Sequence, residues 1–172
     1  MNPETMWEGR YIVAVRDGRW EYVRRARNIR AVVILAQTDD GELLLVEQMR
    51  VPIGRRCIEL PAGLIGDDDG GEDDTVELAA RRELEEEAGY RAATIEPLGD
   101  YYSSPGMVSE SFSLVRARGL IRAGAGGGTD GEDIVVHRVA LDDLPAFVEA
   151  QRAAGTGIDV KLLLLLGGAL LG

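Results

Sequence analysis

The chain has 172 residues and a formal net charge of −11; 45% of its residues are hydrophobic and 28% are charged. This composition is typical of one soluble globular domain with a substantial core. The negative charge argues against nonspecific binding to nucleic acid or to an anionic membrane. The single cysteine, Cys57, excludes an internal disulfide. Together with a polar start that shows no signal peptide, it predicts a cytoplasmic protein.

The first residues predict an antiparallel hairpin. Residues 11–15 and 20–24 alternate apolar and polar side chains around Asp17-Gly18, which is a turn signal. Because an isolated hairpin is only marginally stable in water, we expect this one to pack against another element.

Three further strands are predicted before residue 61. The continuous apolar run 31–36 is typical of a strand covered on both faces. The Gly41 turn after it predicts a second hairpin with residues 43–48. A short strand is expected at residues 57–60.

An acidic helix follows. Asp73 or Asp74 is a candidate N-cap, and Glu77 completes a capping-box pattern with Asp74. Gly89 is a candidate left-handed terminator, so the pattern predicts a helix over residues 75–88.

One face of this helix carries both apolar and charged side chains. At about 100° per residue, Val76, Ala79, Ala80 and Leu84 share a stripe with Glu83, Glu86 and Glu87. Inward carboxylates at this spacing need cations, and hard oxygen ligands without Cys or His favour Mg²⁺ or Mn²⁺. A solvated acidic helix with i,i+4 salt bridges is the alternative.

Residues 82–90 read R-E-L-E-E-E-A-G-Y, which resembles the R-E-U-x-E-E-x-G-U end of the Nudix box. The family pattern places a glutamate where this chain has Asp74. Gly63 lies five residues too far upstream, which indicates an insertion within residues 66–71. The resemblance implies an α/β Nudix fold: an α/β/α sandwich with a mixed central sheet, preceded here by the N-terminal antiparallel hairpin. Residues 59–63, E-L-P-A-G, resemble the approach to the box and imply metal ligation by the Ala62 carbonyl with Glu83, Glu86 and Glu87.

Two segments resemble substrate-binding parts of ADP-ribose pyrophosphatases in this family. The sequence around Arg50 resembles E-Q-x-R-x-P and implies contact with a substrate phosphate; a surface arginine is the alternative. Residues 103–110 join strands expected at 95–102 and 111–118 and resemble S-P-G-x-x-x-E, in which Pro105 marks the subfamily. This loop, with Met107, is expected to bind substrate, or else is an ordinary hairpin loop. Trp20 is a further candidate for substrate binding, with core packing as the alternative.

Residues 123–131 form a glycine-rich segment that we expect to be the most flexible part of the chain. Alignment on the following E-D-I implies a metal-binding or catalytic role for Glu132 and a catalytic base at Asp130; Glu86 is the alternative base. A strand is expected at residues 132–139, with a structural role for His137.

The C-terminal part predicts two helices, residues 143–153, capped by Asp142, and 158–166, ending near Gly167. The Leu-rich end is too short and too broken by glycine to span a bilayer.

Two domains are expected: residues 1–28, an extension that contacts a second copy in a homodimer, and 29–172, the Nudix domain. The resemblance implies metal-dependent hydrolysis of ADP-ribose, a small-molecule substrate, to AMP and ribose 5-phosphate. A sugar-nucleotide pyrophosphatase acting on GDP-mannose, for example, and a non-catalytic nucleotide sensor are the alternatives.

Overall fold

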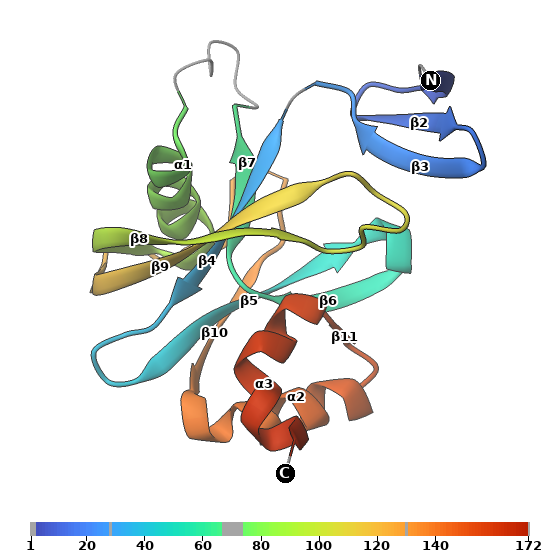
Figure 1. Ribbon diagram of the computed structural model, residues 1–172. Coiled ribbons are helices and arrows are strands. Elements are labelled where there is room, and N and C mark those ends of the chain that lie inside the picture. Colours follow the sequence, from blue (N-terminus) through green and yellow to red (C-terminus); the bar gives the residue numbers. More distant parts are fainter. Residues whose placement is uncertain (1–2, 28, 67–73, 130, 172) are drawn as a thin grey trace.

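The computed structural model describes residues 3–27, 29–66, 74–129 and 131–171, and the strands within these ranges form three sheets (Figure 1). The first is an antiparallel N-terminal sheet of β1 (Glu4–Glu8), β2 (Ile12–Asp17) and β3 (Trp20–Arg25). The predicted hairpin is β2–β3, and β1 extends it to three strands.

The other two sheets form the body and contain both parallel and antiparallel pairs. One has the order β7-β4-β9-β8, with bounds β4 (Arg30–Ala36), β7 (Ala62–Ile65), β8 (Tyr90–Tyr102) and β9 (Ser111–Arg122). The other has the order β10-β5-β6-β11, with bounds β5 (Glu42–Arg50), β6 (Arg55–Glu59), β10 (Val135–Ala140) and β11 (Gly157–Ile158). A 3₁₀ turn, Val51–Ile53, joins β5 to β6.

Strand β4 is covered on both faces, as its continuous apolar run predicts. Val32 and Ile34 pack with the helix α1 (Val76–Glu83), whereas Val33 packs with the C-terminal helices. Helices therefore cover the strands from opposite sides (Figure 1), which is the expected α/β/α arrangement.

The prediction of a β4–β5 hairpin is wrong. The two strands lie in different sheets, and an isolated bridge between Gln37 and Leu43 joins them at the turn. Strand β4 instead pairs with β7 on one edge and, in parallel, with β9 on the other. Turn residues determine where a chain reverses, but burial of both faces determines which strands pair.

The C-terminal part differs in detail from the prediction. Helix α2 (Leu144–Ala153) follows a 3₁₀ turn, Leu141–Asp143, and no side chain caps it, so Asp142 does not have the predicted role. The second predicted helix is divided into β11, a 3₁₀ turn (Val160–Leu162) and α3 (Leu163–Leu171), which continues past Gly167. In the described ranges, none of the helices has the length and apolar character needed to cross a membrane.

Candidate active site

Helix α1 continues into a π-helical turn, Leu84–Ala88, which ends at the left-handed Gly89 as predicted (φ 77°). Its start differs, because the Thr75 side chain caps the helix by accepting a hydrogen bond from the Leu78 N–H at 3.2 Å. The predicted capping role of Asp74 is therefore wrong; Asp73 lies outside the described residues. The Asp74 carboxylate instead accepts hydrogen bonds from Arg82 (3.2 Å) and from the Gly66 N–H (3.1 Å).

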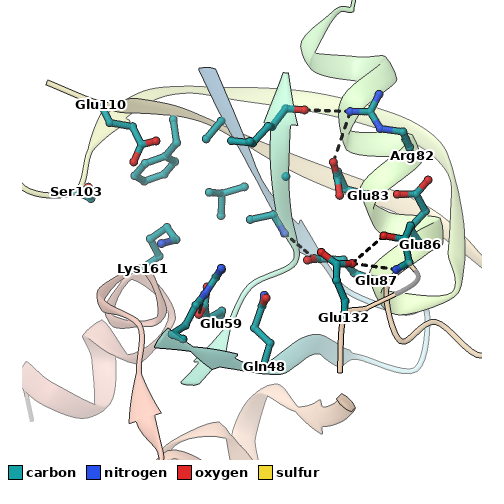
Figure 2. A pocket seen from close by; sticks show the side chains of 18 of the residues that line it. Gln48, Glu59, Arg82, Glu83, Glu86, Glu87, Ser103, Glu110, Glu132 and Lys161 are labelled. Atoms are coloured by element: carbon teal, nitrogen blue, oxygen red, sulfur yellow. Dashed lines mark hydrogen bonds and ion pairs between the residues drawn. The ribbon is translucent and has the colours of Figure 1, made fainter. Parts of the chain in front are cut away.

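A cavity of about 590 Å³ opens beside this helix. Figure 2 shows Glu83, Glu86, Glu87 and Glu132 gathered on one side of it. Lys161, Ser103 and Glu110 lie on the other side, with Glu59 and Gln48 between the two groups. The structure thus brings together the four predicted glutamates.

Two of these glutamates are in an environment that disfavours their charge. Burial raises the pKa of Glu83 to about 7 and that of Glu87 to about 8. Arg82 lowers the pKa of Glu83, and the Ala62 N–H lowers that of Glu87 by donating a hydrogen bond to its Oε2 at 2.9 Å. The negative charge of Glu132 adds to the rise for both, so a cation in the cavity would relieve the repulsion.

Gly63 leaves room for Glu83, whose side chain lies directly against the backbone of β7. A Cβ atom at position 63 would come within 1.9 Å of Cδ of Glu83. A side chain at position 63 would therefore displace Glu83 from its present position in the cavity.

Arg50 lines the cavity and forms a bidentate ion pair with Glu59. Its Nε and Nη2 atoms donate to the two carboxylate oxygens at 2.6 and 2.7 Å. Glu59 is only 4% exposed, so Arg50 is oriented by a buried carboxylate.

Within the glycine-rich segment that was expected to be the most flexible part of the chain, residues 123–128 are hydrogen-bonded to the end of the helix. Their backbone N–H groups hydrogen-bond to carbonyls at the end of the helix, from Ala123 and Gly124 to Gly89, from Gly127 to Glu87, and from Gly128 to Glu86, at 2.8–3.0 Å. Free C-terminal carbonyls need partners, and here the loop supplies them. The sequence did not predict these contacts, because glycine composition indicates backbone freedom and not what the backbone contacts.

The loop delivers Glu132 to the cavity. Oε2 of Glu132 accepts hydrogen bonds from the Thr129 N–H (2.9 Å) and hydroxyl (3.3 Å). Strand β10 begins only at Val135, so Glu132 lies in the turn before it rather than in the predicted strand. Asp130, the predicted base, lies outside the described residues.

The remaining candidates for substrate binding do not line this cavity. Trp20 is 57% exposed on β3, and Met107 is 61% exposed in the loop with Pro105. That loop contributes Ser103 and Glu110 to the cavity instead.

The N-terminal sheet contacts the loop of residues 103–110. It therefore packs against another element, as expected. Val23 of β3 hydrogen-bonds to the backbones of Met107 and Ser109 at 2.9 Å. Nε of Arg25 donates to Glu110 at 2.6 Å, and this ion pair lines the cavity.

Sequence reasoning overlooked several cavity residues. Glu59 and Glu110 belong to the E-L-P-A-G and S-P-G-x-x-x-E segments, so those matches could have indicated them. Lys161 has no such signal; its ammonium group lies 2.7 Å from Asp159 and 5.7 Å from the Phe112 ring centre.

Cys57 and His137 both lie outside the cavity lining, and His137 has the structural surroundings that were expected. Cys57 is 6% exposed in β6, and burial raises the pKa of its thiol to about 12, which suppresses nucleophilic reactivity. The His137 ring packs against Phe147 and hydrogen-bonds to Glu47.

The cavity glutamates fit a divalent cation by their chemistry. They are hard oxygen donors, two of them desolvated, and Arg82 already pairs with Asp74 and Glu83. Among the residues that the structure describes, no three Asp, Glu, His or Cys side chains converge on one point as they stand.

The fold, the helix with inward glutamates and the cavity define a known class of protein: the family model described as NUDIX domain matches residues 27–159, and the chain belongs to this family. It is similar to a GDP-mannose pyrophosphatase of Cronobacter sakazakii, with 34% identity covering 91% of this chain and 82% of the relative. An ADP-ribose pyrophosphatase of Bacillus subtilis is 36% identical over 78% of this chain and 72% of its own. A methanol dehydrogenase activator of Bacillus methanolicus is 31% identical over 87% of this chain and 82% of its own. A crystal structure titled ADP compounds hydrolase matches with a TM-score of 0.67 and 26% identity, covering 100% of this chain and 93% of that one.

Proposed function

We propose that this chain hydrolyses the diphosphate bond of ADP-ribose, giving AMP and ribose 5-phosphate. One observation carries the proposal: four glutamates of the Nudix helix and its adjoining loop face a cavity that Arg50 also lines. The B. subtilis relative, named ADP-ribose pyrophosphatase, supports the choice of substrate. The desolvated glutamates argue against a non-catalytic sensor, because binding alone does not need four carboxylates facing an anionic ligand.

Mg²⁺, or Mn²⁺ in its place, is the cofactor that we propose. The Ala62 carbonyl and the carboxylates of Glu83, Glu86, Glu87 and Glu132 would hold it. When bound, the ion neutralises phosphate oxygens and lowers the pKa of a water.

The protein groups then have distinct parts in the reaction. Arg50 binds a phosphate oxygen, and Glu59 fixes the direction of its guanidinium. Glu132 or Glu86 takes the proton from the attacking water, with Asp130 as a third candidate. Arg82 braces Asp74 and Glu83 without a direct part in the chemistry.

Turnover of a panel of nucleoside diphosphate compounds tests the proposal. Purified protein with Mg²⁺ should release AMP from ADP-ribose, and EDTA should abolish this release. Product formation that persists in EDTA would contradict the metal-dependent mechanism.

GDP-mannose is the second candidate, because the C. sakazakii relative is named for it and matches nearly the whole chain. A kcat/KM for GDP-mannose above that for ADP-ribose would favour this alternative. The same carboxylates and Arg50 would act on either diphosphate.

Without metal, the free energy of unfolding should fall as pH rises, and a bound metal ion should offset this fall. The pKa values of Glu83 and Glu87, about 7 and about 8, lie above the ordinary 4.5, so between those limits the folded chain binds more protons than the unfolded one. The free energy of unfolding therefore falls as pH rises through this window. We expect a lower Tm at about pH 8 than at about pH 6 without metal, and a larger rise on adding Mg²⁺ at the higher pH.

Glu87→Gln is the control for that measurement, since it removes the group with the higher pKa. It should flatten the dependence of Tm on pH. An unchanged slope in the variant would show that the titration comes from elsewhere in the chain.

We also propose that residues 1–28 form an extension that contacts a second copy of the chain. The N-terminal sheet exposes large apolar side chains, namely Met6, Trp7, Tyr11, Ile12 and Trp20. Exposed apolar surface of this kind is typical of an interface. In a homodimer of this kind, we propose that Trp20 reaches the substrate cavity of the partner. Light scattering with Trp7→Ser and Trp20→Ser variants tests whether the N-terminal sheet forms the dimer interface.

A further inference from the structure

One arginine outside the cavity ties three elements together. Nε of Arg56, on β6, donates to Oε1 of Glu47 on β5 at 2.7 Å, and Nη2 donates to the Glu47 carbonyl at 2.9 Å. The same guanidinium reaches the segment before β10. Nη1 donates to Oδ2 of Asp133 at 2.8 Å and Nη2 donates to the Asp133 carbonyl at 3.0 Å.

The Glu47 end of this network is well fixed. Its second oxygen, Oε2, lies 2.8 Å from Nε2 of His137. Burial opposes ionisation of Glu47, but the hydrogen bonds from His137 and Arg56 outweigh it and lower the pKa below its ordinary value. Arg56 is therefore held by an ionised carboxylate that the neighbouring strand orients.

The Asp133 end lies next to the cavity residue Glu132. The Asp133 side chain is 85% exposed, so its ion pair adds little to stability. Its carbonyl, however, is main chain, and the bond from Arg56 restrains the path of the backbone directly after Glu132. Two other backbone bonds lie close to this point: the Glu132 N–H donates to the Thr129 carbonyl at 3.0 Å on the preceding side, whereas after Asp133 the bond from the Ile134 N–H to the Gly127 carbonyl is long at 3.4 Å.

We propose that Arg56 is a positioning residue that holds Glu132 over the cavity by anchoring Asp133. The inference rests on the proposed function, in which Glu132 binds the metal or accepts a proton. Thr129, which precedes Glu132 in the chain, restrains the Glu132 carboxylate through a hydrogen bond. Arg56 restrains the backbone directly after Glu132 through the Asp133 carbonyl. A carboxylate displaced by about 1 Å can cost about a hundredfold in rate.

Arg56→Ala tests the proposal by steady-state kinetics with ADP-ribose and Mg²⁺. We expect kcat to fall by about ten- to a hundredfold, with KM changed by less than about twofold, because the arginine is not among the residues that line the cavity. Arg56→Lys should recover only part of the loss, since an ammonium cannot reproduce the planar fork.

Arg138→Ala is the matched control. Arg138 also links β10 to β5, through an ion pair with Glu42, and its removal changes the net charge equally. Within the described residues its guanidinium hydrogen-bonds to Glu42 and not to Asp133, so kcat should stay within about twofold of the parent. An equal loss in both variants would mean that general weakening of the β5–β10 pairing, not the position of Glu132, lowers the rate.

A double variant separates this inference from the proposed function. In a Glu132→Gln background, Arg56→Ala should cause almost no further loss, because there is no longer a carboxylate to position. Losses that multiply would overturn the positioning role. If Glu132→Gln alone keeps full turnover, the role of Glu132 fails and the inference fails with it. If Glu132→Gln loses turnover while Arg56→Ala keeps it, only the inference fails.

Asp133→Ala provides a test that does not depend on the folding of the arginine variants. The side chain is largely exposed, so the fold should be unaffected. Arg56 would still hold the carbonyl at this position, and the expected loss of kcat is therefore smaller than in Arg56→Ala. A larger loss would place the effect on Asp133 itself.

Discussion

Glu86→Gln and Glu87→Gln should each lower kcat for ADP-ribose hydrolysis by about a thousandfold. Each change removes a negative charge that we assign to metal binding; several kcal/mol of charge stabilisation are then lost, and each 1.4 kcal/mol is tenfold in rate. The fold should persist, because glutamine has nearly the same shape and can still accept the Ala62 N–H. Above about pH 8 and without metal, Glu87→Gln should also raise Tm, since Glu87 is then ionised and the substitution removes a buried charge.

Glu85→Gln is the control for these variants. Glu85 lies on the same helical turn but pairs with Arg91 at 2.6 Å and is not among the residues that line the cavity. Its turnover should match that of the parent. Near-normal turnover in both the Glu86 and the Glu87 variants would show that the site is wrongly assigned.

Gly126→Ala should destabilise the protein and reduce its activity. Gly126 has φ 70°, and a Cβ there would come within 2.6 Å of the Ala88 carbonyl carbon and of the Glu87 oxygen. The left-handed backbone alone costs about 1–2 kcal/mol in a residue other than glycine, and displacement of the loop would break its bonds to the helix. Thermal unfolding should show Tm lowered by at least about 2–4 °C per kcal/mol lost.

Gly124→Ala offers a matched comparison two residues away. A Cβ at this position meets nothing within 4 Å, and the backbone does not have positive φ. The substitution should change stability by less than about 0.5 kcal/mol. Equal destabilisation by both substitutions would mean that the contact with the helix end does not explain the effect.

The predictions that succeeded rest on periodicity and local spacing. The alternation before Asp17, the apolar run of β4 and the helical spacing of Glu83, Glu86 and Glu87 are encoded within a few residues of one another. For this reason the strands and the carboxylate wall of the cavity could be expected from the sequence, whereas the Nudix fold was implied by the resemblance of residues 82–90 to the family motif.

The features that were missed depend on contacts between distant segments. The parallel pairing of β4 with β9 cannot be predicted from the residues that neighbour either strand, and the position of Lys161 cannot be predicted from its own neighbours. The π-helical turn also depends on a distant segment, because its carbonyls accept hydrogen bonds from a glycine-rich loop nearly 40 residues further along the chain. Residue propensity alone predicts that the backbone of this loop is unconstrained, whereas tertiary hydrogen bonds fix it to the end of the helix.

Two cations of the cavity lie just outside the residues that the NUDIX family model matches. The family match runs from residue 27 to residue 159, whereas Arg25 and Lys161 flank these limits. The four glutamates and Arg50 lie within the matched residues, and the flanking residues add two cations to the lining of the same cavity. A chain trimmed to the matched residues would keep its glutamates but leave Glu110 and Asp159 without their cationic partners. Relatives can therefore differ in their selectivity among nucleotide substrates through changes at the two ends of the chain, while the residues matched by the family model stay the same.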